Sequence, residues 1–113
     1  MRAVIVASWR GVRPRQKDSA AEYAQEVRRY WAKQVGRGLC SKPKWRVNDD
    51  GTGYWYVTGA LEDLLLLSAT NTARWHALQG PFLLDGFEEN FYVVGARKAD
   101  QPMEALLREG NLI

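Results

Sequence analysis

The chain has 113 residues, of which 46% are apolar, 26% charged and 12% aromatic. This length suits one domain with its own core and is too short for two ordinary domains, while the aromatic content argues against disorder. The single cysteine, Cys40, and the single histidine, His76, exclude an intrachain disulfide and any metal site that needs two residues of either kind.

The net charge of +3 is a weak indication of anionic partners. Basic residues gather in two segments, 10–17 and 37–46, which either bind a carboxylate or phosphate or are simply solvated loops. No apolar run is long enough to span a membrane, and the N-terminus lacks the apolar stretch of a signal peptide. We therefore expect a cytoplasmic protein.

The first nine residues are apolar almost throughout, which is typical of a central strand covered on both faces. A long helix is predicted from Ser19 to Val35. Ser19 and Glu22 match a capping box, apolar residues recur at spacings of one, three and four, and two glycines follow as a stop. Short strands are predicted over 44–47 and 53–58, joined by a turn.

Residues 61–78 admit two interpretations. In the favoured one, 64–69 is a buried strand and Asn71 caps a short helix that ends at Leu78, because the polar cluster 68–72 is a poor helix interior. In the other, the whole stretch is one longer helix. Gly80 and Pro81 end the helix in both interpretations.

A last strand is predicted over 91–96, and one or two helical turns over 103–108. The resulting order is that of a ferredoxin-like βαββαβ domain, an α+β fold with two helices on one face of an antiparallel sheet. We expect one domain over 1–113, with 98–113 peripheral. The open face of the sheet would expose a large apolar patch, so we expect a homodimer in which a second subunit covers it.

The segment 64–87, with Pro81, Phe82 and Gly86, followed by the strand 91–96, resembles the second half of dimeric α+β barrel proteins. That superfamily includes YCII-type domains, muconolactone isomerases, and the small cofactor-independent monooxygenases and cyclases of polyketide pathways. The segments 22–26 and 45–47 are similar to the muconolactone isomerase type. The first helix lacks the histidine that YCII-type domains pair with an aspartate, so the resemblance implies the fold and the dimer rather than one reaction.

His76 is the one side chain whose ordinary pKa suits proton transfer near neutral pH. The alternative is a histidine with only a surface or core role. Asp85, Glu88 and Glu89 follow nearby, and we expect Asp85 to hydrogen-bond the imidazole. If Asn71 caps the helix, Trp75 faces the core, while His76 lies on its flank at the rim of an aromatic pocket.

The aromatic residues point to a binding pocket, because buried Trp N–H and Tyr O–H groups need hydrogen-bond partners. A flat ligand would supply them; a dimer interface or a tryptophan-rich core are the alternatives. On the strand 53–58, Tyr54 and Tyr56 share one face, and we expect one of them to line the gap between helix and sheet. The candidate substrate-binding residues are Trp9, Tyr23, Tyr30, Trp31, Tyr54, Tyr56, Trp75 and Phe82.

These observations predict a cofactor-independent enzyme for a small aromatic, polyketide-like or lactone substrate. His76 or Asp85 would remove a proton and hydrogen-bond donors would stabilise the enolate, leading to isomerisation, cyclisation or monooxygenation. The alternative is a non-catalytic binding or accessory protein of the same fold. An RNA-binding protein that uses its sheet is disfavoured, because the glycine-and-aromatic pattern of such sheets is missing and a net charge of +3 is small for that function. We expect no metal or organic cofactor, since no dinucleotide or phosphate-binding motif is present.

Overall fold

The structure is a computed structural model that describes residues 1–95. Its strands are β1 (Arg2–Trp9), β2 (Gly11–Val12), β3 (Lys44–Val47), β4 (Gly53–Ala60), β5 (Leu84–Asp85) and β6 (Glu88–Val93). Its helices are α1 (Lys17–Gly36), α2 (Leu61–Ser68) and α3 (Asn71–Leu83). The expected last residue of the final strand, the turns over 103–108 and the peripheral tail over 98–113 lie outside the described residues.

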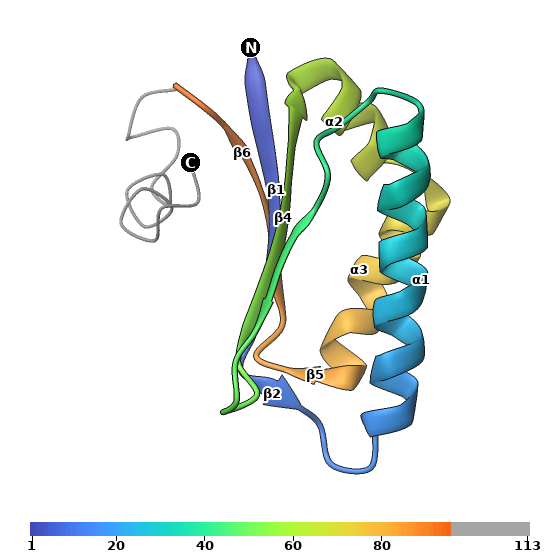
Figure 1. Cartoon of the computed structure of the whole chain (residues 1–113), viewed down its shortest axis with the longest axis vertical. Coiled ribbons are helices and arrows are strands. Elements are labelled where there is room, and N and C mark those ends of the chain that lie inside the picture. Colours follow the sequence, from blue (N-terminus) through green and yellow to red (C-terminus); the bar gives the residue numbers. More distant parts are fainter. Residues whose placement is uncertain (96–113) are drawn as a thin grey trace.

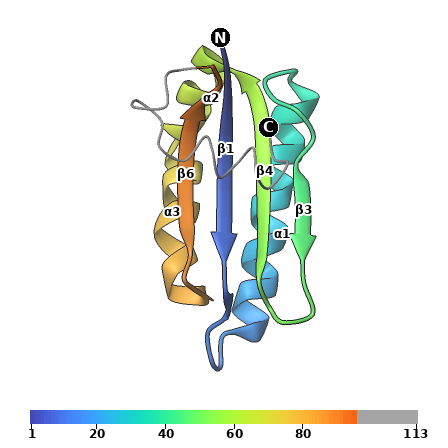
Figure 2. The same cartoon turned by 90° about the vertical axis from the view of Figure 1, so that its left-hand side faces the viewer.

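Four strands form one antiparallel sheet in the order β3-β4-β1-β6, and β2 pairs with β5 in a small second sheet. The helices lie on one face of the larger sheet (Figure 1), with α1 behind β4 and β3 and α3 behind β6 (Figure 2). This is the ferredoxin-like arrangement, so the predicted fold class is confirmed. None of the helices in residues 1–95 has the length and apolarity needed to cross a membrane.

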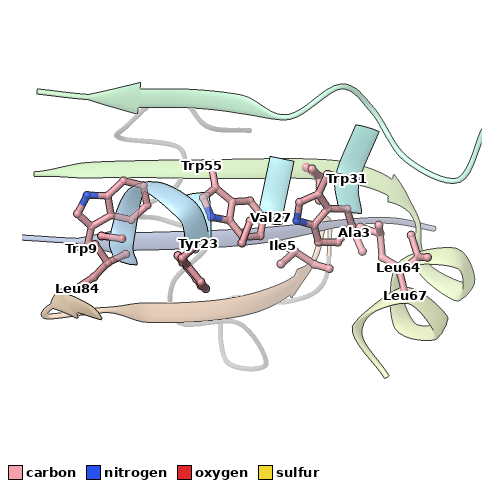
Figure 3. Close-up of a cluster of buried hydrophobic side chains, with 13 residues drawn as sticks. Ala3, Ile5, Trp9, Tyr23, Val27, Trp31, Trp55, Leu64, Leu67 and Leu84 are labelled. Carbon is pink, nitrogen blue, oxygen red and sulfur yellow. The ribbon is translucent and has the colours of Figure 1, made fainter. Parts of the chain in front are cut away.

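The core lies between the sheet and the helices because alternate strand residues point toward α1 and α2. Ile5 and Trp55 project from the sheet, and Val27 and Trp31 come from α1 (Figure 3). Trp31 and Trp55 pack with ring centroids 5.6 Å apart. Every second residue of β4 is buried, as the alternation predicts.

The predicted strand over 64–69 is wrong, since this stretch belongs to α2 and its C-terminal cap. Leu64 and Leu67 are buried while Leu65 and Leu66 are exposed, which is the three-residue spacing of a helix. Glu62 and Asp63 in the first turn favour a helix here through the macrodipole. The alternative of a single long helix is also incorrect, because Ala69 and Thr70 are not helical and separate α2 from α3.

Several predicted helix and strand ends differ from the structure. The α1 helix begins at Lys17 after Gln16, with no side-chain cap, so the capping box at Ser19 does not form. The α3 cap is Thr70, whose hydroxyl accepts a bond of 3.2 Å from the Ala73 amide. The α3 helix also continues through Pro81 to Leu83, and β6 begins at Glu88 rather than Phe91.

Candidate functional site

His76 lies on α3 and is wedged between two tyrosines of α1. Its side chain is only 7% exposed. The rings of Tyr23 and Tyr30 each have their centroid 5.9 Å from the imidazole centroid, in edge-to-face geometry. Trp75, the preceding residue, is 58% exposed. The expected placement is thus reversed: the histidine packs against α1 and the tryptophan is exposed.

The phenols of the two tyrosines also hydrogen-bond to backbone carbonyls of α3 and α2. Tyr23 Oη donates a buried hydrogen bond of 2.9 Å to the carbonyl of His76. Tyr30 Oη donates one of 3.0 Å to the carbonyl of Leu67 and lies 2.8 Å from Thr70 Oγ1. These bonds connect α1 to the α2–α3 junction and fix the position from which the imidazole projects.

The imidazole lines a groove between α1 and α3, which we call the histidine groove. Its volume is about 590 Å³, within the ~300 to 1,000 Å³ of typical small-molecule sites. On the α1 side the groove is lined by Tyr30, the acidic Glu26 and the basic Arg29 and Lys33. On the α3 side it is lined by His76 together with Asn71, Thr72 and Trp75.

Burial lowers the pKa of His76, and the charge of Glu26 partly offsets that effect. The imidazole is therefore neutral near pH 7 and has a lone pair available to accept a proton. No hydrogen bond to its ring nitrogens is found within residues 1–95. A neutral imidazole beside two cations and an aromatic wall can take a proton from a bound molecule and stabilise the resulting anion.

Asp85 does not bond to His76 in this structure. It lies in β5, is half exposed, and has a carboxylate oxygen 3.9 Å from Nη2 of Arg10. Its backbone carbonyl accepts a bond of 2.8 Å from the Arg10 amide. The predicted hydrogen bond between Asp85 and the imidazole is therefore absent, because β5 pairs with β2 and the Asp85 carboxylate lies beside Arg10.

Glu89 is the acid that sequence reasoning noted without selecting. It pairs with Ala7 in the β1–β6 register and so projects into the helix-facing side of the sheet. Burial raises the pKa of Glu89 to about 7. Burial also raises the pKa of Tyr23, with a smaller contribution from Glu89. The alternation of Phe87, Glu89 and Phe91 was the available signal, since two partly buried aromatics of the core flank this acid on the same strand face.

The other predicted binding residues fall into separate places. Trp9, Tyr23 and Trp31 are buried on the helix-facing side of the sheet. Tyr54 and Tyr56 project from the opposite face, because the register aligns Trp55 and Val57 with the core instead, so neither lines the gap between helix and sheet. Phe82 is 72% exposed on α3. Of the eight residues, Tyr30 and Trp75 line the histidine groove.

Metal ligands are sparse in the part of the chain that the structure describes. No group of three or more His, Cys, Asp or Glu side chains gathers there in a geometry that could hold an ion. Cys40 is half-buried and burial raises the pKa of its thiol, which disfavours the thiolate that a metal would require.

Similar proteins are found by structure and not by sequence. No protein-family profile matches the sequence, and no curated protein matches it significantly. The structure of Rv0793 from Mycobacterium tuberculosis is similar, with a TM-score of 0.64 at 10% identity over 86% of this chain and 98% of that one. SnoaB, a cofactor-independent oxygenase from Streptomyces nogalater, gives a TM-score of 0.58 at 12% identity over 85% and 95%.

A hydroxynitrile lyase from Passiflora edulis gives 0.60 at 10% identity over 85% of this chain and 95% of the lyase. The fold is ferredoxin-like. These structures share that fold with this chain, and it is the fold that the resemblance in the sequence implied. An oxygenase and a lyase on one fold show that the fold hosts different reactions, so function rests on the site.

Proposed function

We propose that this protein is a cofactor-independent enzyme that removes a proton from a small aromatic, polyketide-like or lactone substrate, with His76 as the base. The observation that carries the proposal is the place of the His76 imidazole in the histidine groove, where its ring nitrogens have no hydrogen-bond partner within residues 1–95. Both nitrogens reach the groove, because Tyr92 Oη is the one fully buried side-chain N or O atom in residues 1–95 that has no hydrogen bond.

The groove supports each part of the reaction. The exposed ring of Trp75 offers a flat surface for an aromatic substrate. His76 accepts the proton from an acidic carbon, and the electron pair moves to the neighbouring carbonyl to give an enolate. Arg29 or Lys33 stabilises the enolate oxygen, while Glu26 stabilises the imidazolium.

The fate of the enolate defines the overall reaction. Return of the proton to another carbon is isomerisation, attack on a carbonyl is cyclisation, and electron transfer to oxygen begins a monooxygenation. The likeness to SnoaB supports the last of these by analogy of fold alone.

The proposal is tested by solvent deuterium exchange, which detects proton abstraction without knowledge of the product. A panel of enolisable aromatic ketones, polyketide-like β-dicarbonyls and lactones is incubated with the protein in D₂O, and loss of the C–H signal is followed by NMR. Catalysed exchange of at least one compound by the wild type, lost in His76→Gln, is the expected result. Binding of these compounds without exchange favours the alternative, a non-catalytic small-molecule-binding protein.

We further propose that the chain assembles as a homodimer through the face of the sheet opposite the helices. Tyr54 and Tyr56 project there from β4, half-buried, with ring centroids 6.5 Å apart. Half-exposed stacked tyrosines on a sheet face are typical of protein interfaces, where aromatic residues are enriched.

A further inference from the structure

A second cavity lies on the other side of α1 from the histidine groove. Its volume is about 210 Å³, and it opens between the N-terminal half of α1 and the end of the sheet. Three tryptophans from three adjacent strands form its sheet side: Trp9 of β1, Trp45 of β3 and Trp55 of β4. Trp45 is not among the residues predicted from the sequence to bind substrate. We call this space the tryptophan cavity.

The cavity exists because small helix residues oppose large strand residues. Ala20, Ala21 and Ala24 line it from α1, so no long side chain fills the space beneath the helix. The indoles are held in place, with ring centroids 6.3 Å apart for Trp9 and Trp45 and 5.9 Å apart for Trp45 and Trp55. Gly53 lets Trp9 approach the strand, since a Cβ there would lie 2.5 Å from the indole.

Among the described residues, the indole N–H groups around the tryptophan cavity have no acceptor, whereas Tyr23 Oη, which also lines the cavity, is bonded to the His76 carbonyl. Trp9 and Trp55 are 9% and 3% exposed, yet none of the three indole N–H groups donates a hydrogen bond within residues 1–95. A fully buried indole N–H usually finds an acceptor, but these three are not fully enclosed, because Tyr92 Oη is the one fully buried side-chain N or O atom without a partner in residues 1–95. These donors are therefore available to an oxygen atom of a molecule bound in the cavity.

Two cations complete the lining, and no carboxylate belongs to it. The guanidinium of Arg28 lies 4.5 Å from the ring centroid of Trp45, and Lys17 lines the cavity from the first turn of α1. The one ion pair among the described residues joins Arg10 to Asp85, so neither Arg28 nor Lys17 is paired with an acid there. The cavity thus combines flat apolar walls with uncompensated positive charge.

We propose that the tryptophan cavity binds a planar aromatic carboxylate of one or two rings. The ring would lie among the indoles, and its carboxylate would accept bonds from Arg28, Lys17 or an indole N–H. The volume is below the ~300 to 1,000 Å³ of drug-sized sites, which favours a small ligand. The site is separate from the histidine groove, because no residue lines both and residues 17, 20, 24 and 28 form one stripe of α1 while residues 26 and 33 lie on another.

The test is isothermal titration calorimetry of the full chain with 2-naphthoate, compared with the uncharged 2-naphthamide. We expect one saturable site for the carboxylate and affinity about tenfold weaker or worse for the amide. Arg28→Gln should weaken 2-naphthoate binding by about tenfold, and Ala24→Leu should abolish it by filling the cavity. Arg37→Gln removes the same charge outside the cavity and is the matched control, with affinity unchanged.

His76→Gln separates this proposal from the proposed enzymatic function, because it should retain full affinity for 2-naphthoate even if it loses deuterium exchange. Equal binding of carboxylate and amide, unchanged affinity in Arg28→Gln, or the absence of saturable binding would each overturn the assignment. Ala24→Leu is checked by circular dichroism. If it does not fold, Arg28→Gln, which alters an exposed side chain, decides the outcome alone.

Discussion

The phenol of Tyr23 donates a 2.9 Å hydrogen bond to the backbone carbonyl of His76, and the two rings meet edge to face. One side chain of α1 therefore sets both the height and the tilt of the candidate base on α3. Tyr23 also lines the tryptophan cavity, so it lies between the two candidate sites.

Replacement of Tyr23 by Phe should leave the His76 carbonyl without its buried donor. We expect a loss of about 1 to 2 kcal/mol in the free energy of unfolding, measured by urea denaturation. Tyr30→Phe, which alters a partly buried phenol, is the comparison and should cost less. Equal stability of Tyr23→Phe and wild type would show that the bond does not hold α3 against α1.

Glu89 should make the protein less stable as the pH rises from about 4.5 to 7. Burial raises its pKa from the ordinary 4.5 to about 7, so across this window the folded protein holds a proton that the unfolded chain releases. In Glu89→Gln this component of the pH dependence should vanish, and at pH 8 the variant should be more stable by about 1 to 3 kcal/mol.

Urea denaturation at pH 5 and pH 8 measures the effect. The depressed pKa of His76 acts below pH 6.5 with the opposite sign, and it cancels in the comparison because both proteins contain it. Glu88→Gln, at the exposed neighbour, is the control and should follow the wild type. A Glu89→Gln protein with the wild-type pH dependence would mean that the carboxyl is solvated.

Gly80 should tolerate no side chain, even though alanine favours a helix. A Cβ at this position would lie 2.5 Å from the Phe87 ring, which packs against α3 there. Gly80→Ala should therefore lower the thermal midpoint. Phe87→Leu in the same chain should recover part of the loss, because it removes the ring that collides. A higher midpoint for Gly80→Ala alone would show that the contact relaxes freely.

The dimer proposal predicts a species of twice the 12.9 kDa chain mass in sedimentation equilibrium at micromolar concentration. Tyr56→Asp should shift it toward the monomer, because the substitution places a charge on the proposed interface. Leu78→Asp, at a side chain 63% exposed on α3, should leave the mass unchanged. A clean monomer for the wild type would refute the proposal.

Helices and strands whose apolar pattern repeats over many residues could be predicted from the sequence, whereas short apolar runs could not be assigned correctly. The stripe of α1 and the alternation of β4 were sufficient for the fold, because each repeats over many residues. The four leucines 64–67 were ambiguous, since a short apolar run fits both a buried strand and a helix. His76 could be selected by its chemistry, but its neighbours Glu26 and Arg29 could not, because they come from α1 and depend on how α1 and α3 pack.

The central claim is that His76 acts as a general base in the histidine groove, and the pH profile of catalysed deuterium exchange tests it most directly. On a compound that exchanges, the wild-type rate should be constant near neutral pH and fall in acid with a pKa below 6.5, because protonation removes the base. His76→Gln should lower the rate by about two to four powers of ten and abolish the acid limb. An unchanged rate and profile in His76→Gln would contradict the account.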